Sequence, residues 1–449
     1  MKKDVDILIL GGLIVTMDQD ETIHQEGAVA INDGKIVDLG EIERIRSTYR
    51  GNTEIDATGC VVMPGLINVH THSPMTVFRG LADDLPLMTW LKEHIFPAEK
   101  KINRDIVYKG TLLACAEMIL GGTTTFVDMY YFEDKAAEAT KKAGLRAVLG
   151  ETILDFPSPD SPNTEAQLKY AEKFIQSYKD DELITPAVAP HAPYTCSPDT
   201  LIKAKNIADR YSVPYLIHLS ETQDEVNTIQ ERYGKRPVEH LEAIGVLSRD
   251  SPSKIIAAHC VWLTDKEIDI LRDYNVGVAH NPESNMKLAS GIAPVTEMLE
   301  NSIDVGLGTD GAASNNNLDM IEEMHTAALI HKVFSGDPTT LPAEKVVEMA
   351  TIRGARAIGM DHKIGSLEPG KYADIILIST DAPNMTPLYN VYSHIVYAAS
   401  SSDVDTTIVH GRILMENREI KTFDEKSVKE KARELGEKVK ESLKDNNNS

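Results

Sequence analysis

Histidines and carboxylates recur in this chain at the ends of short apolar runs. His70-Thr-His72 closes the first such run, and because side chains two apart on a strand share a face, the two imidazoles point the same way. His218 and Asp310 close two later runs. Three imidazoles and one carboxylate form a donor set that suits zinc, with one position left for water. The pattern therefore predicts a catalytic metal site made of His70, His72, His218 and Asp310.

Two further residues have the chemistry that such a centre needs. A metal lowers the pKa of its bound water, and a nearby base must take the proton and pass it to the leaving group. Glu221, three residues past His218, suits that role. His259 closes another apolar run, and we expect it to orient the nucleophile or stabilise developing charge rather than to act as a fifth ligand. The alternative for His259 is a buried structural histidine.

A regular alternation of elements positions these residues. Short apolar segments, most of them followed by a helical pattern, occupy residues 65–72, 123–128, 145–149, 184–191, 215–221, 255–259, 276–280 and 305–310. Eight strands alternating with helices predict an α/β fold, a (β/α)₈ TIM-like barrel, over residues 63–365. This span exceeds the roughly 250 residues typical of the fold, so we expect long loops at 74–101 and 156–164.

The two ends of the chain have a different pattern of apolar and turn-forming residues. Residues 1–62 and 366–423 carry short apolar runs broken by turn signals such as Asn32-Asp33-Gly34, which predicts one small β-sandwich domain built from both chain ends. After Asp424, apolar residues at helical spacing predict a C-terminal helix with a frayed tail over 424–449.

Composition narrows the possible partners. The 449 residues include 46 Lys+Arg and 69 Asp+Glu, a net charge of −23, which argues against nucleic acid and anionic membranes as partners. No stretch approaches the roughly 20 apolar residues of a membrane span, and the first residues lack a signal-peptide pattern. The cysteines, Cys60, Cys115, Cys196 and Cys260, are scattered and predict free thiols in a reducing, cytoplasmic compartment.

Several strings resemble the amidohydrolase superfamily. They are Pro64-Gly-Leu-Ile-Asn-Val-His-Thr-His72, His218-Leu-Ser-Glu221, Ala258-His259-Cys260, Ala279-His280-Asn-Pro and Gly308-Thr-Asp310. Within it the chain is most similar to the 5-methylthioadenosine/S-adenosylhomocysteine deaminases, including 5′-deoxyadenosine deaminases, through Phe78-Arg-Gly-Leu-Ala-Asp-Asp-Leu-Pro-Leu-Met-Thr-Trp90-Leu and the Glu99 that follows. The resemblance implies a metal-dependent hydrolytic deaminase that converts 5′-modified adenosines to the corresponding inosines and ammonia.

The same resemblance implies roles for individual residues. Asp310 would be both a metal ligand and an acceptor of the water proton, and Glu221 would carry that proton to the purine and contact it. Glu99 would bind the ribose hydroxyls, His191 would contact the ribose side, and Trp90 would line the pocket for the 5′-substituent. One divalent ion is expected, zinc or alternatively ferrous iron, because no lysine ends the strands where binuclear members bridge two metals. A small-molecule nucleoside substrate and a homo-oligomer are also implied.

One departure bears on the substrate. We align Glu151 with the arginine by which members that accept S-adenosylhomocysteine hold its carboxylate. Two carboxylates repel, so small uncharged 5′-groups are expected to gain preference. Lys141 and Lys142, from a neighbouring subunit, could compensate, but we favour solvated helix charges for both. We expect His280 to lie near the metal, with its role open.

Two other functions fit the same residues less well. Guanine deamination or triazine hydrolysis could use the same metal site, but a ribose-binding Glu99 has no purpose for a free base. A catalytically silent barrel that serves as a binding or assembly module would have no need of buried carboxylates, which cost several kcal/mol to desolvate.

Overall fold

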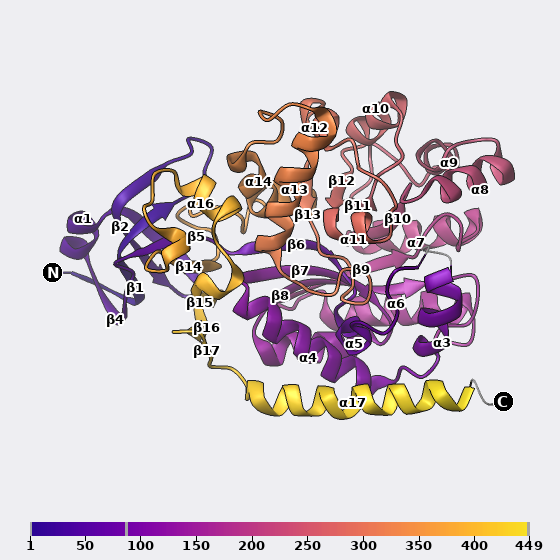
Figure 1. Ribbon diagram of the computed structural model, residues 1–449, viewed down its shortest axis with the longest axis horizontal. Helices are drawn as coiled ribbons and strands as arrows, with labels where there is room; N and C mark the ends of the chain where they lie inside the picture. The colour runs from indigo at the N-terminus through magenta and orange to yellow at the C-terminus, as the bar shows by residue number, and fades with distance from the viewer. Residues whose placement is uncertain (1, 86–88, 447–449) are drawn as a thin grey trace.

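Two sheets organise the chain (Figure 1). This computed structural model describes residues 2–85 and 89–446. Two parts of the sequence interpretation therefore lie outside the described residues. They are residues 86–88, within the string that resembles nucleoside deaminases, and the predicted frayed end at 447–449.

The larger part of the chain is a closed parallel barrel. Its strands hydrogen-bond in sequence order, and a parallel bridge between Thr71 and Asp310 joins the first strand to the last. The strands are β6 (Leu66–Thr71), β7 (Thr123–Tyr130), β8 (Arg146–Ile153), β9 (Ile184–Pro190), β10 (Tyr215–Leu219), β11 (Ile255–His259), β12 (Gly277–His280) and β13 (Val305–Leu307). The predicted TIM-like fold is confirmed, and each strand lies within a few residues of its expected range.

Alternating side chains fill the inside of the barrel. Val127, Val148 and Leu216 belong to one buried apolar cluster, whereas their sequence neighbours Phe126 and Leu149 pack into the helix layer. This period of two, buried on both faces, is what a parallel sheet covered by helices requires. The polar side chains of the predicted site lie where the strands end.

Helices surround the barrel (Figure 1). Capping side chains start several of them, as Asn103 does when its Oδ1 accepts from the backbone N–H groups of Asp105 and Ile106. The longer helices are α4 (Arg104–Leu120), α5 (Glu133–Ala143), α6 (Thr164–Tyr178), α7 (Pro198–Tyr211), α8 (Gln223–Tyr233), α10 (Asp265–Asp273), α13 (Met320–Ser335) and α14 (Ala343–Ala350). The shorter ones are α9 (Pro237–Ala243), α11 (Pro282–Lys287), α12 (Val295–Glu300) and α15 (Ile352–Ala357).

The region expected as a long loop at 74–101 is partly helical. It contains η1 (Ser73–Phe78), a turn of π-helix η2 (Trp90–Ile95) and α3 (Phe96–Glu99). Trp90, Leu91 and Ile95 are buried, and packing of these apolar side chains orders the segment over the strand ends. The region 156–164 lacks helix or strand up to the start of α6, as expected.

The second sheet joins segments from both ends of the chain, which lie side by side in Figure 1. β5, which leads into the barrel, pairs antiparallel with β14, which follows it, with Ile375 opposite Pro64. The strands are β1 (Lys3–Val15), β2 (Ile23–Asn32), β3 (Lys35–Glu41), β4 (Tyr49–Asp56), β5 (Cys60–Pro64), β14 (Ile375–Ser379), β15 (Val404–Val409), β16 (Arg412–Glu416) and β17 (Glu419–Ile420). A small β unit built from both chain ends is confirmed; we retain 1–62, 63–365 and 366–423 as proposed limits.

Other short helices accompany this sheet, and one long helix follows it. The short elements are α1 (Ile42–Thr48), η3 (Pro383–Met385), α16 (Val391–Tyr397) and η4 (Ser401–Asp403). α17 (Glu425–Asn446) runs beside α4 along the edge of the barrel in Figure 1, with Val428, Leu435 and Val439 buried. Among the described residues, none of the helices is both long and apolar enough to cross a membrane.

Candidate metal centre

Two histidines are held with their Nε2 atoms facing each other. His72 Nδ1 lies 2.7 Å from the carbonyl oxygen of Met129, and His218 Nδ1 lies 2.7 Å from that of His191. A carbonyl can only accept, so each Nδ1 carries a proton and each Nε2 presents a lone pair. The two Nε2 atoms are 3.3 Å apart. Two lone pairs at this distance need a cation or a proton between them.

His70 and Asp310 complete the cluster. Asp310 Oδ1 lies 3.2 Å from His72 Nε2 and 3.5 Å from His70 Nε2. His70 Nε2 is buried without a hydrogen-bond partner. Together, the orphaned nitrogen, the facing lone pairs and the carboxylate are the donor set of a divalent metal site, and the four predicted ligands therefore come together in space.

The electrostatics of the cluster also suit a cation. Burial lowers the pKa of His70 to about 4, and burial with the surrounding imidazoles holds that of His218 well below its usual value. Burial opposes ionisation of Asp310, but the adjacent imidazoles of His70 and His72 outweigh it and hold the pKa of this carboxyl well below its usual range. Burial opposes protonation of His72 as well, but the hydrogen bond with Asp310 raises the pKa of His72 to about 9. Neutral imidazoles and an ionised carboxylate are the forms that bind metal, so a bound cation would displace the extra proton of His72.

Side-chain hydroxyls hold the other oxygen of Asp310. Ser284 and Ser314 donate to Oδ2 at 2.7 and 3.0 Å, which leaves Oδ1 turned toward the histidines. Close packing beneath the site needs Gly308, because a Cβ there would lie 2.6 Å from Asn281 Oδ1 and 2.9 Å from the backbone nitrogen of His70. Sequence reasoning missed both serines, which stand in two separate polar runs, after residue 280 and after Asp310.

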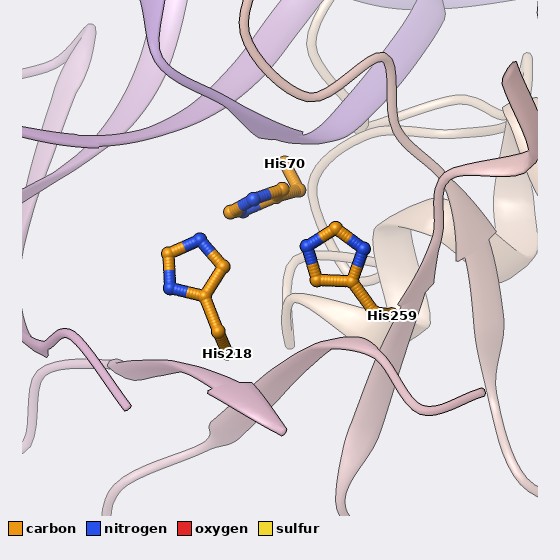
Figure 2. Close-up of side chains that lie close together, drawn as sticks. All are labelled: His70, His218 and His259. Atoms are coloured by element: carbon orange, nitrogen blue, oxygen red, sulfur yellow. The ribbon is translucent and has the colours of Figure 1, made fainter. Parts of the chain in front are cut away.

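His259 reaches the cluster through an unusual backbone conformation. Its φ is +73°, and that of Cys260 is +48°, a left-handed region that costs a non-glycine residue free energy. Figure 2 shows the rings of His70, His218 and His259 facing a common space, and one ligand nitrogen from each lies within 4.8 Å of the others. His259 therefore lies at the centre itself.

Glu221 borders the same space. Its Oε2 lies 3.9 Å from His259 Nε2, and Ser290 donates to its Oε1 at 3.3 Å. Burial raises the pKa of Glu221, and the nearby imidazole of His259 partly offsets this. The loop is held by Glu225 in the first turn of α8, whose carboxylate accepts the N–H groups of Ser220 and Glu221 at 2.9 and 2.8 Å. Sequence reasoning missed Glu225, although an acid in a first helical turn is a recognisable signal.

A cavity opens from this cluster, and the remaining predicted residues line it. Trp90, Glu99 and His191 all border the cavity together with the cluster. Tyr130 donates to Glu99 at 2.7 Å, and burial raises the pKa of Glu99 to about 7 despite this hydrogen bond. Burial and the neighbouring imidazoles lower the pKa of His191 to about 3. Trp90 Nε1 donates to the backbone oxygen of Ala82 at 3.1 Å.

Glu151 does not face this cavity, which corrects the sequence interpretation. On β8 its neighbour Thr152 lines the cavity, so Glu151 points outward to the helix layer. It is fully buried there and accepts the N–H of Glu133 at 3.2 Å, at the start of α5. Burial and the nearby charge of Asp160 raise its pKa well above the usual value. Glu151 therefore cannot repel a substrate carboxylate.

His280 also faces away from the centre, contrary to expectation. Its Nε2 lies 3.1 Å from Nε2 of His331 on α13, and burial with that neighbour holds its pKa well below the usual value. Lys141 pairs with Asp181 on the surface, and Lys142 borders a groove beside α17. Neither lysine lines the cavity of its own chain.

A closed barrel with a histidine and aspartate metal site at its strand ends defines a class of metal-dependent hydrolases. Residues 61–414 match the model of the Amidohydrolase family. The chain belongs to this family.

Relatives with full-length similarity carry more specific names. The chain is 52% identical to the 5-methylthioadenosine/S-adenosylhomocysteine deaminase of Syntrophobacter fumaroxidans, over 97% of this chain and 98% of that one. It is 49% identical to the 5′-deoxyadenosine deaminase of Methanosarcina acetivorans over the same shares. The structure of an adenosine deaminase from Xanthomonas campestris with bound zinc matches with a TM-score of 0.95 and 37% identity, covering 98% of this chain and all of that one.

Proposed function

We propose that this protein is a metal-dependent hydrolytic deaminase that converts 5′-modified adenosines to the corresponding inosines and ammonia. The candidate substrates are 5′-methylthioadenosine, 5′-deoxyadenosine, S-adenosylhomocysteine and adenosine. The observation that carries the proposal is one cavity that joins the metal-site cluster to the buried carboxyl of Glu99. The names of the relatives support the same reaction class.

The proposed chemistry divides between the metal site and the chain. One divalent ion, which we propose is zinc held by His70, His72, His218 and Asp310, supplies a water of lowered pKa when bound. Ionised Asp310 accepts a proton from the nucleophile. Glu221, with its raised pKa, takes one proton of the water and delivers it to N1 of the purine, as a general acid–base must. The other proton of the water, taken up by Asp310, goes to the leaving amine, which departs as ammonia. The pKa values of Asp310 and Glu221 are shifted in opposite directions, and this difference assigns the two carboxyls to different roles.

The other end of the cavity suits a nucleoside. We propose that Glu99, oriented by Tyr130, accepts hydrogen bonds from the ribose hydroxyls, and that His191 contacts the sugar. A carboxylate that accepts from two adjacent hydroxyls distinguishes a riboside from a free base, because the buried group would otherwise stay unpaired.

The lining of the cavity favours an uncharged 5′-group. Trp90, Leu91, Ile95 and Phe96 form one wall, and the described lining residues include neither lysine nor arginine. A carboxylate placed there would lose its hydration without gaining a charged partner. We therefore propose a preference for methylthio and hydrogen over the amino-acid tail of S-adenosylhomocysteine, on this ground rather than on Glu151.

Release of ammonia, with the accompanying change in purine absorbance, tests the function. Zinc-loaded protein would be given 5′-methylthioadenosine, 5′-deoxyadenosine, S-adenosylhomocysteine, adenosine, guanine and a chlorotriazine in parallel. We expect turnover of the two uncharged 5′-modified adenosines above S-adenosylhomocysteine. Turnover of guanine or the triazine alone would overturn the proposal.

A variant of Glu99 separates the nucleoside function from the alternatives on the same metal site. Glu99→Ala should raise KM for nucleosides and leave zinc content unchanged, because Glu99 lies outside the ligand cluster. An unchanged KM would count against the ribose role of Glu99.

A further inference from the structure

Asn285 contacts the histidine that reaches the centre through a strained backbone. Its Oδ1 lies 2.9 Å from Nδ1 of His259, and both side chains are buried, with 1% of each residue exposed. We propose that Asn285 is a positioning residue: it accepts the Nδ1–H of His259 and so fixes the tautomer whose Nε2 lone pair faces the reacting centre. The proposal rests on the proposed function only for its catalytic consequence.

A second amide approaches the same nitrogen with the opposite chemistry. Asn281 Nδ2 lies 3.3 Å from His259 Nδ1, and its N–H could only donate to an unprotonated Nδ1. The distance favours Asn285. The shorter contact therefore places an acceptor oxygen on Nδ1 and a proton between the two atoms.

The backbone around Asn285 is built to hold it in place. Asn285 N–H donates to the oxygen of Asn281 at 3.0 Å, and its own oxygen accepts from Ser290 N–H at 2.8 Å. The preceding residue of α11, Ser284, donates to Asp310. One short helix therefore fixes side chains from two strand ends, β11 and β13.

This geometry has a direct consequence for Nε2. With Nδ1 protonated, Nε2 points at the space that His259 shares with Glu221, whose Oε2 is 3.9 Å away. A lone pair there can accept a hydrogen bond from the nucleophilic water. Without Asn285, the ring would be free to adopt the other tautomer.

Nuclear magnetic resonance of the zinc-loaded full chain, labelled with ¹⁵N-histidine, tests the tautomer without any substrate. We expect a hydrogen-bonded imidazole N–H resonance that His259→Gln removes and that is thereby assigned to His259. It should persist in Asn285→Asp, which keeps an acceptor oxygen, and vanish in Asn285→Ala. Met286→Ala is the matched control, because Met286 is the next residue of α11 and is 49% exposed.

Kinetics and zinc content then test the positioning role. We expect Asn285→Ala to keep its zinc and lose about 10- to 100-fold in kcat, the range typical of residues that orient a metal-site group, with little change in KM. Asn285→Asp should recover most of the loss. Persistence of the His259 resonance in Asn285→Ala, or its absence from folded Asn285→Asp, would overturn the proposal. If Asn285→Ala fails to fold, the resonance in Asn285→Asp alone decides whether the proposal stands. Failure to deaminate any adenosine would refute the function but not the tautomer.

Discussion

His259 and His280 occupy equivalent positions on neighbouring strands and face opposite ways. Each is the last residue of its strand, β11 or β12, and each follows an alanine, Ala258 or Ala279, that packs inside the barrel. Alternation would turn both histidines outward. His280 obeys and meets His331 in the helix layer, whereas His259 turns inward to the metal-site cluster.

The opposite directions of the two histidines result from a local backbone conformation. The left-handed φ of His259, +73°, breaks the alternation at the last residue of β11. Backbone hydrogen bonds stabilise it, since Cys260 N–H donates to the oxygen of Leu219 at 3.0 Å and Val261 N–H to that of Ser220 at 3.1 Å. Strain at this point is the cost of bringing one more imidazole into the site. Strand-end residues that face the cavity contact one another in a single cluster. Those that face the helix layer, such as His280, contact only their local neighbours there.

Removal of an inward ligand should have the largest effect. His218→Ala takes one lone pair from the cluster, and loss of the metal would remove several kcal/mol of transition-state stabilisation, or about 10⁴-fold in kcat/KM. Zinc content measured by mass spectrometry should fall well below one per chain. Full zinc occupancy in this variant would remove His218 from the ligand set.

The paired variants His259→Gln and His280→Gln test the comparison itself. We expect a loss of about 10²- to 10³-fold in kcat for His259→Gln, typical of a group that stabilises charge or moves a proton in the transition state. His280→Gln should keep kcat within about threefold and lower stability by about 1 kcal/mol, since one buried hydrogen bond is weakened. Equal losses of kcat in the two variants would contradict the conclusion that His259 faces the site and His280 does not.

The pH dependence of nucleoside binding should report on Glu99. Its pKa of about 7 makes the carboxyl ionised above neutral pH and protonated below it. A carboxylate accepts hydrogen bonds more strongly than a neutral acid, by about 1 kcal/mol. KM should therefore rise about fivefold from pH 8 to pH 6, and Glu99→Gln should flatten this slope. A KM that falls with acidification would contradict the ribose role.

The smallest kinetic effect is expected for an outward carboxyl, Glu151→Gln. Zinc content and the ratio of activities on methylthioadenosine and S-adenosylhomocysteine should change by no more than about twofold, because the side chain is outside the cavity. Stability should change instead. A raised folded-state pKa means that the native protein loses stability as pH rises above the ordinary carboxyl pKa, so thermal melts from pH 5 to 8 should show a flatter decline in the variant.

Much of this arrangement is accessible from the sequence. Eight apolar runs ending in polar residues predict the barrel, and His70, His72, His218, Asp310 and Glu221 follow from it because strand ends of a barrel meet at one face. Glu151 is assigned by its alignment with the family's arginine and His280 by its position at a strand end, and neither criterion says which way a side chain points. Alternation with Thr152 and Ala279 turns both side chains outward.

The sequence by itself determined the class of fold and the chemical types that meet at the strand ends, because hydrophobic periodicity and residue identity are local properties. Only the tertiary structure decided which side chains face the cavity. The contacts of Asn285 with His259, of Ser284 with Asp310 and of Tyr130 with Glu99 join segments distant in the chain, and the left-handed φ of His259 turns its ring into the site. Such contacts depend on backbone conformations that residue type alone does not specify.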